Sequence, residues 1–322
     1  MDKDKTVDCC LLSVDLKIMK KAIRYSIILC MVSWVYAAIM IFGFGITNVS
    51  DNPIKYTVLA SLYMLFPLMV AVVMQKVDKD RLASTGLLRF KIRWSWLVAW
   101  ILPVVIVLLT LCVNALMPGC EFNTDMSAMI PADSVPEEQK EMVSMLMTPA
   151  FLIVITIISG LLAGVTINAV FAFGEEYGWR NYLVDVLRKE KFVRASVFIG
   201  IVWGLWHFPL ILLGHNYPQH FVAGVFMMVI FCVLLSFIET YFVLKAKSVY
   251  PAAIFHGTIH AVAGLNVLLI KGGNDLINGA SGFSGFIVMA VVIAVIYVFD
   301  RYVLKDNIFS KTIGEVLDNV ER

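Results

Sequence analysis

Long apolar stretches alternate with short polar connections along the whole chain. A hydrocarbon core about 30 Å thick requires roughly 20 consecutive apolar residues in a helix that crosses it. Eight stretches come close to this length or exceed it: 22–46, 56–76, 94–117, 149–174, 196–213, 219–244, 249–270 and 282–304. The pattern therefore predicts an all-α, polytopic membrane protein with eight transmembrane helices.

The composition excludes the soluble classes that a length of 322 residues would otherwise allow. Apolar residues make up 60% of the chain and charged residues 16%, and the mean hydropathy is +0.84. A soluble domain is roughly 45 to 50% apolar and about 25% charged. We expect an N-terminal tail over residues 1–21, a membrane domain within the lipid bilayer over 22–304, and a C-terminal tail over 305–322.

Lysine and arginine are distributed unequally between the connections. Of the 26 basic residues, 23 lie in or close to the two tails and the connections after the second, fourth and sixth stretches, and three lie in the other connections. Because basic residues accumulate on the cytoplasmic side, both termini are predicted to be cytoplasmic. The basic residues form no single patch, so no nucleic-acid partner is expected.

The longest of the predicted outer connections covers residues 118–148 and is acidic and rich in methionine. Within it, Met142, Met145 and Leu146 recur at helical spacing. Residues 135–147 are therefore predicted to form a helix that lies on the outer surface.

Ionisable side chains at membrane depth are costly, so each is a functional candidate. The fourth stretch ends with Glu175 and Glu176, followed by Arg180. On a helix Glu176 and Arg180 share a face, whereas Glu175 points about 100° away. Arg180 can therefore hold Glu176 while Glu175 stays free to react. The alternative is an ordinary charged end of a span at the cytoplasmic boundary.

Three histidines are expected inside the membrane. His207 lies about 16 Å along the fifth stretch, close to Pro209, which bends the helix and frees a carbonyl. His256 and His260 are four residues apart on the seventh stretch, so they share a face. Glu175, His207 and His256 are expected to converge in one intramembrane cavity that opens to the cytoplasmic half.

The remaining polar groups in these stretches carry weaker expectations. Asn168 is seven residues before Glu175 and can line the same cavity. Glu239 and Asn266 are interpreted as helix-packing or interfacial groups. His215 and His220 lie in a short outer connection and are interpreted as solvated.

At these residues the chain resembles the CPBP family, the CAAX prenyl protease and bacteriocin-processing (Abi) group of intramembrane endopeptidases. That family carries Glu-Glu-x-x-x-Arg, Phe-x-x-x-His and His-x-x-x-Asn or Asp on three membrane helices. The corresponding residues here are Glu175-Glu176-x-x-x-Arg180, Trp203-x-x-x-His207 and His256-x-x-x-His260. The match covers roughly residues 149–270, the expected catalytic core. Trp203 and His260 depart from the pattern.

The resemblance implies hydrolysis of a peptide bond in a prenylated or membrane-associated peptide, in a multi-pass protein of a bacterial cell membrane. It assigns Glu175 as the general base with His207 assisting, and His256 and His260 to the oxyanion hole. Glu176 and Arg180 are assigned structural support. No cofactor is implied.

Three other functions fit the same residues. Glu175, His207, His256 and His260 could bind zinc in a metal-dependent version of the protease, because zinc takes three or four nitrogen and oxygen ligands. A membrane scaffold or bacteriocin immunity factor could bind a peptide without cleaving it. A transporter could use the histidines and a carboxylate to relay protons.

Overall fold

The computed structural model describes the backbone of residues 3–78, 87–124 and 148–318, and side chains from residue 19 onward. Its first half contains α1 (Lys3–Ala38), η1 (Ile39–Gly43), α2 (Pro53–Tyr63), α3 (Phe66–Val77), α4 (Trp94–Ala115), β1 (Cys120–Phe122), α6 (Pro149–Val165) and α7 (Ile167–Glu176). Its second half contains η6 (Tyr177–Leu183), α8 (Val184–Val186), α9 (Phe192–Trp206), α10 (Phe208–Leu212), α11 (Phe221–Ala246), α12 (Tyr250–Val262), α13 (Gly264–Leu269), β2 (Ile270–Gly272), α14 (Phe283–Val298), η7 (Phe299–Leu304), η8 (Ile308–Ser310) and α15 (Ile313–Asp318). The surface helix predicted over residues 135–147 lies outside the described residues.

The described part of the chain contains six helices that are long and apolar enough to cross a membrane. A seventh crossing is formed if α6 and the helix that continues from α7 to Val186, bent by 53°, are one span. The remaining predicted span, 196–213, corresponds to α9 and α10; α9 has only 15 residues and ends at His207, before α10. The structure therefore confirms a polytopic helical membrane protein, and the number of eight spans stays a prediction.

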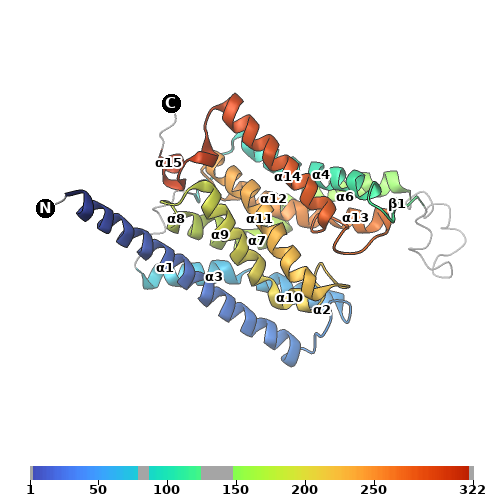
Figure 1. Cartoon of the computed structure of the whole chain (residues 1–322). Coiled ribbons are helices and arrows are strands. Elements are labelled where there is room, and N and C mark those ends of the chain that lie inside the picture. The colour runs from blue at the N-terminus through green and yellow to red at the C-terminus, as the bar shows by residue number, and fades with distance from the viewer. Residues whose placement is uncertain (1–2, 79–86, 125–147, 319–322) are drawn as a thin grey trace, which may run out of the picture.

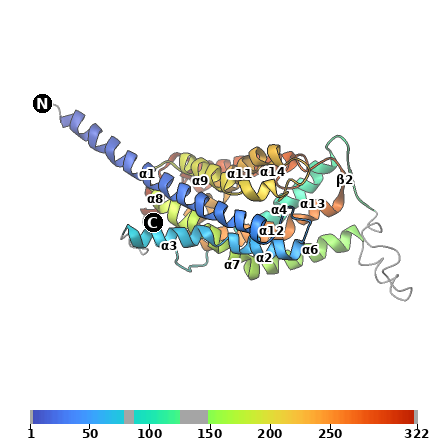
Figure 2. The ribbon, with the colours of Figure 1, turned by 90° about the horizontal axis from the view of Figure 1, so that it is seen from below.

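The helices form one elongated bundle, and different elements lie at its two ends (Figures 1 and 2). One end holds both termini; here α15 is held by an ion pair between Arg188 and Asp318, and an isolated bridge joins Lys191 to Thr312. Of the C-terminal tail predicted over 305–322, the described residues 305–318 thus contact the bundle. At the other end β1 and β2 pair as a two-stranded antiparallel sheet, the one departure from an all-α fold among the described residues.

Glycines allow the helices that carry the site to approach closely. A Cβ atom at Gly200 would lie 2.4 Å from Val233 Cα, and one at Gly204 would lie 2.5 Å from Val229 Cα. The two glycines are four residues apart on α9, as are the two valines on α11, which gives the small-residue contact common between membrane helices. This contact fixes Trp203 and His207 relative to α11.

The helix α12 lies inside the bundle, against α4, α6, α7 and α11. Its Gly257 leaves no room for a side chain, because a Cβ atom there would lie 2.9 Å from the backbone nitrogen of Ala169. The Asn168 Nδ2 group donates to the carbonyl of Gly257 over 3.1 Å. The histidines of α12 are therefore held directly beside α7, the helix that carries the glutamates.

Candidate active site

Glu175 lies at the end of α7, where the helix continues into the π-helix η6. Its side chain is 1% exposed, and its Oε2 atom accepts hydrogen bonds from two indoles, Trp203 Nε1 at 2.7 Å and Trp179 Nε1 at 3.4 Å. Within the part of the chain that the structure describes, no hydrogen bond reaches Oε1. This carboxylate is thus fixed by one oxygen while the other is available to a water molecule.

His207 lies at the break between α9 and α10. Its Nδ1 atom is 2.8 Å from the carbonyl oxygen of Trp203, and a carbonyl can only accept, so Nδ1 carries the proton. The neutral ring consequently offers the lone pair of Nε2.

Glu175, His207 and His260 line one cavity of about 250 Å³. Its wall also includes Asn168, as predicted from the spacing along the helix, and Tyr56. A water molecule occupies about 30 Å³ in the liquid, so the cavity has room for several. The cavity therefore brings a carboxylate and an imidazole together with space for water.

His256 is 1% exposed and lines neither this cavity nor the larger one described below, so of the three residues expected to converge in one cavity only Glu175 and His207 do; His256 contacts it through His260. Its Nδ1 atom is 2.8 Å from Glu176 Oε1, and its Nε2 atom is 3.1 Å from Nε2 of His260. A carboxylate accepts, so Nδ1 of His256 donates and its Nε2 accepts the proton of His260 in the neutral pair. The side chain of His260 is exposed to the cavity.

The predicted ion pair between Glu176 and Arg180 is present, and it is part of a larger buried cluster. Arg180 Nη1 lies 3.1 Å from Glu176 Oε1, and Nη2 lies 2.5 Å from Glu239 Oε2 and 3.1 Å from Ser236 Oγ. The guanidinium also lies 4.4 Å from the ring centre of Trp203. Arg180, counted with the basic residues of a cytoplasmic connection, is in fact fully buried.

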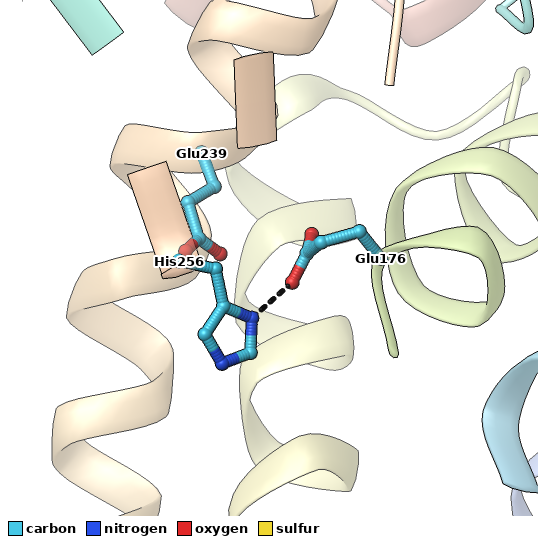
Figure 3. Close-up of side chains that lie close together, drawn as sticks. All are labelled: Glu176, Glu239 and His256. Carbon is cyan, nitrogen blue, oxygen red and sulfur yellow. Dashed lines mark hydrogen bonds and ion pairs between the residues drawn. The ribbon is translucent and has the colours of Figure 1, made fainter. Parts of the chain in front are cut away.

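Three of these side chains could hold a metal ion. In the described part of the chain, the group whose ligand atoms all lie within 4.8 Å of one another is Glu176, Glu239 and His256 (Figure 3). It shares only His256 with the predicted zinc set of Glu175, His207, His256 and His260, and that set stays a prediction. The two carboxylates of the group are already paired with Arg180.

A second cavity, of about 580 Å³, adjoins the first and shares His207, His215 and His260 with it. Both cavities include residues of the connection that follows α10, at the end of the bundle away from the termini. The predicted opening to the cytoplasmic half and the predicted orientation of the termini both stay predictions.

Several site residues were missed by the sequence analysis. His215 is not a solvated loop residue; it lines both cavities, its Nδ1 lies 2.9 Å from the Tyr56 hydroxyl, and its ring stacks on that of His207 with centres 6.4 Å apart. Glu239 is fully buried and pairs with Arg180. The position of Glu239 within an otherwise apolar helix could have indicated a buried, paired carboxylate. No local sequence pattern indicates that the connection with His215 lines the cavities.

Known proteins are similar to the part of the chain that carries the candidate site. Residues 149–262, which contain the glutamates and all three site histidines, match the model of the family described as type II CAAX prenyl endopeptidase Rce1-like. A protein named CAAX prenyl protease 2 from Methanococcus maripaludis is 37% identical over 92 residues, which is 27% of this chain and 34% of that relative.

The matched part of the chain spans about a third of the length of this relative. The match with the family model and the three motifs of the site agree on the same segment. Through residues 149–262, the chain is similar to the type II CAAX prenyl endopeptidase, Rce1-like family.

Proposed function

We propose that this protein is an intramembrane endopeptidase of the CPBP, or CAAX prenyl protease, type that hydrolyses a peptide bond with water activated by Glu175. The observation that carries the proposal is the carboxylate of Glu175 on the wall of a cavity that it shares with His207. Hydrolysis of a peptide bond needs a base for the water and a donor for the oxyanion, and both kinds of group line this cavity.

Glu175 and His207 act on the water molecule. Oε1 of Glu175 takes one proton from the water, and Nε2 of His207 accepts a hydrogen bond from its other hydrogen. The oxygen adds to the carbonyl carbon, the carbon–nitrogen bond then breaks, and the proton on Glu175 passes to the leaving amine. The bonds from Trp203 and Trp179 hold Glu175 in place through these steps.

His256 and His260 stabilise the oxyanion as a pair. One proton lies between their Nε2 atoms in the neutral pair, so a donor becomes available when His260 turns this N–H towards the cavity. Glu176 accepts from His256 on the other side and keeps its ring in position. Arg180 and Glu239 in turn hold Glu176.

The protein is proposed to cross the membrane eight times with both termini in the cytoplasm. Without the buried Arg180, the two sides hold 22 and three basic residues, and this unequal distribution supports the orientation. The substrate is proposed to be a prenylated or membrane-associated peptide, and the name of the Methanococcus relative, CAAX prenyl protease 2, supports this.

Cleavage by the purified protein in lipid nanodiscs tests the proposal. A farnesylated peptide that ends in a CAAX sequence and an unprenylated apolar peptide serve as substrates, with products identified by mass spectrometry. Glu175→Gln should slow cleavage by about 10² to 10⁴-fold, the usual contribution of a general base. Glu121→Gln, an exposed carboxylate in β1, is the matched control and should cleave at the wild-type rate.

The same assay separates the alternatives. Full activity of Glu175→Gln would refute the assignment of the base. Cleavage that follows the metal content of the protein and is lost with a chelator would favour the zinc-dependent protease. Tight binding of a peptide without hydrolysis by any variant would favour the scaffold.

A further inference from the structure

Three side chains of the described residues line both cavities, and all three are histidines: His207, His215 and His260. His207 and His260 belong to the motifs of the site, whereas His215 lies in the connection between α10 and α11 and has no part in the proposed hydrolysis. The larger cavity has an apolar wall from α11, α12 and α13, and Glu175 lies in the smaller one. A peptide that extends from the larger cavity to Glu175 therefore passes these three histidines.

The backbone holds His215 in a tight turn directly after α10. Its N–H group donates to the carbonyl of Leu210 over 3.1 Å, and its own carbonyl accepts from the N–H group of Tyr217 over 2.8 Å. Gly214 has a φ of +90°, a conformation that residues with a Cβ atom rarely adopt, so the chain can turn immediately before His215. The position of His215 is thus fixed by its own connection.

The side chain of His215 is held through one of its two nitrogens. Nδ1 lies 2.9 Å from the hydroxyl of Tyr56 in α2, which lies at the same end of the bundle as α10 (Figure 1). A phenol hydroxyl is a better donor than acceptor, because the ring withdraws electron density from its oxygen, so Tyr56 donates and Nδ1 accepts. Burial lowers the pKa of His215 to about 4, so the ring is neutral at pH 7 and its one proton is on Nε2.

The Nε2–H group of His215 is a donor at the junction of the two cavities, and nothing among the described residues accepts from it. The other two histidines have no such donor in the neutral state. His207 has its proton on Nδ1, bonded to Trp203, and the proton of His260 is accepted by His256. The rings of His207 and His215 are nearly parallel, at 8°, so they stack and do not bond to each other. The junction therefore offers a lone pair from His207 and a donor from His215.

A peptide bound in these cavities loses water from its backbone carbonyls, and a buried carbonyl without a partner is costly. From this geometry we infer that His215 binds the substrate: its Nε2–H group donates a hydrogen bond to the backbone carbonyl oxygen of a residue beside the cleaved bond. Tyr56 acts through His215 and is a positioning residue, because its hydroxyl keeps the proton on Nε2. This inference rests on the proposed function, since the peptide crosses the junction in order to reach Glu175.

Binding of a peptide to the protein in nanodiscs tests this contact without cleavage. Every variant carries Glu175→Gln, and the farnesylated CAAX peptide carries an N-terminal fluorophore whose anisotropy gives the Kd. His215→Leu has no donor and should weaken binding by about tenfold, the effect of one lost hydrogen bond to a buried carbonyl. His215→Gln, whose amide is again a donor, should bind within about threefold of the histidine.

His220→Leu is the matched control for these variants. His220 lies in the same connection and lines neither cavity, so its Kd should be unchanged. Its partner Asp275 keeps the hydrogen bonds from two backbone nitrogens, those of Gln219 and His220, so the connection stays in place.

A change in the peptide shows whether the contact is direct. The peptide group directly before or directly after the cleaved bond is replaced by an alkene, which keeps the shape and removes the carbonyl. With at least one of these two peptides, His215→Leu should no longer weaken binding. Tyr56→Phe should weaken binding of the unmodified peptide by a smaller factor than His215→Leu, and should have no effect in the His215→Leu background.

Three results would each overturn the inference: equal Kd values for His215 and His215→Leu, binding by His215→Gln as weak as that by His215→Leu, or a tenfold difference that persists with both alkene peptides. The second result would show that the histidine has only a structural role. The third would show that it does not touch these carbonyls.

Binding and cleavage are measured separately, so the two proposals can fail separately. A Kd that depends on His215, without cleavage by the protein with intact Glu175, would reject the protease and keep the peptide contact. Cleavage with the same kcat and KM in the wild-type protein and in His215→Leu would keep the protease and reject the contact.

Discussion

Loss of Arg180 should be among the most destabilising changes in this protein. Its guanidinium pairs with both Glu176 and Glu239, and all three side chains are fully buried. With all three ionised the cluster has one excess negative charge, and without arginine it has two. Removal of one partner of a buried ion pair typically costs about 3 to 5 kcal/mol. We expect Arg180→Met, which keeps much of the apolar stem, to cost this much free energy of unfolding.

A change of Glu239 should cost far less, because Glu239→Gln leaves Arg180 paired with Glu176 and removes the excess charge. We expect about 1 kcal/mol for this variant, the usual net contribution of one hydrogen bond. In the Arg180→Met background the same change should restore at least about 1.5 kcal/mol, because one of the two unpaired carboxylates becomes neutral. Coupling of this size is typical of residues in contact.

Reversible unfolding in mixed micelles, followed by tryptophan fluorescence, measures these free energies. Arg194→Met is the matched control, since Arg194 is 73% exposed and its pair with Glu190 at 3.2 Å is a surface pair. Such pairs contribute about 0 to 1 kcal/mol. Equal costs for Arg180→Met and Arg194→Met, or no coupling between positions 180 and 239, would refute the buried cluster as the support of the site.

Two further predictions concern Trp203 and Gly204. Trp203→Phe keeps a ring beside Arg180 but removes the 2.7 Å hydrogen bond to Glu175, so cleavage should slow by about tenfold at unchanged folded yield. A wild-type rate of cleavage would show that this bond does not position the carboxylate. Gly204→Val should lower the free energy of unfolding by about 1 to 3 kcal/mol, because its Cβ atom would lie 2.5 Å from Val229 Cα. Gly264→Ala, where an added Cβ atom has no neighbour within 4 Å, should cost nothing measurable, and equal stability of the two variants would contradict the close packing of α9 on α11.

The apolar pattern predicts the membrane class and most of the spans, because a transmembrane helix must be apolar over its whole length whatever its neighbours are. The pattern is less informative where a span is broken. The bend between α6 and α7 and the interruption of α9 at His207 are set by packing against α12 and α11. Pro209 indicated the interruption near His207 in the sequence. No residue near Thr166 indicated the bend between α6 and α7.

The candidate site was predictable where residues share one helix. Spacing alone paired Glu176 with Arg180 and His256 with His260, and both contacts are present. Contacts between helices were not accessible in this way. That Glu239 reaches Arg180, and that the indole of Trp203 donates to Glu175, depends on the rotation of α9 and α11 about their axes. The rotation of each helix is set by its contacts with neighbouring helices, and these contacts cannot be predicted from a single sequence.

His260 stands where the family has asparagine or aspartate, and its substitution separates the possible mechanisms. Its Nε2 atom lies 3.1 Å from His256, and its side chain is exposed to the cavity. Asparagine is a permanent neutral donor, so His260→Asn should keep or raise the rate of cleavage. His260→Ala removes the donor and should slow cleavage by about 10² to 10³-fold.

The zinc-dependent protease predicts the opposite for this position. Asparagine is a poor ligand for zinc, so His260→Asn would lose both metal and activity if His260 bound the ion. Cleavage rate and metal content are therefore measured on the same preparations of wild type, His260→Asn and His260→Ala. Metal-dependent cleavage that disappears in His260→Asn would reject the oxyanion role, because a donor that only hydrogen-bonds the substrate oxygen is replaceable by an amide and a metal ligand is not.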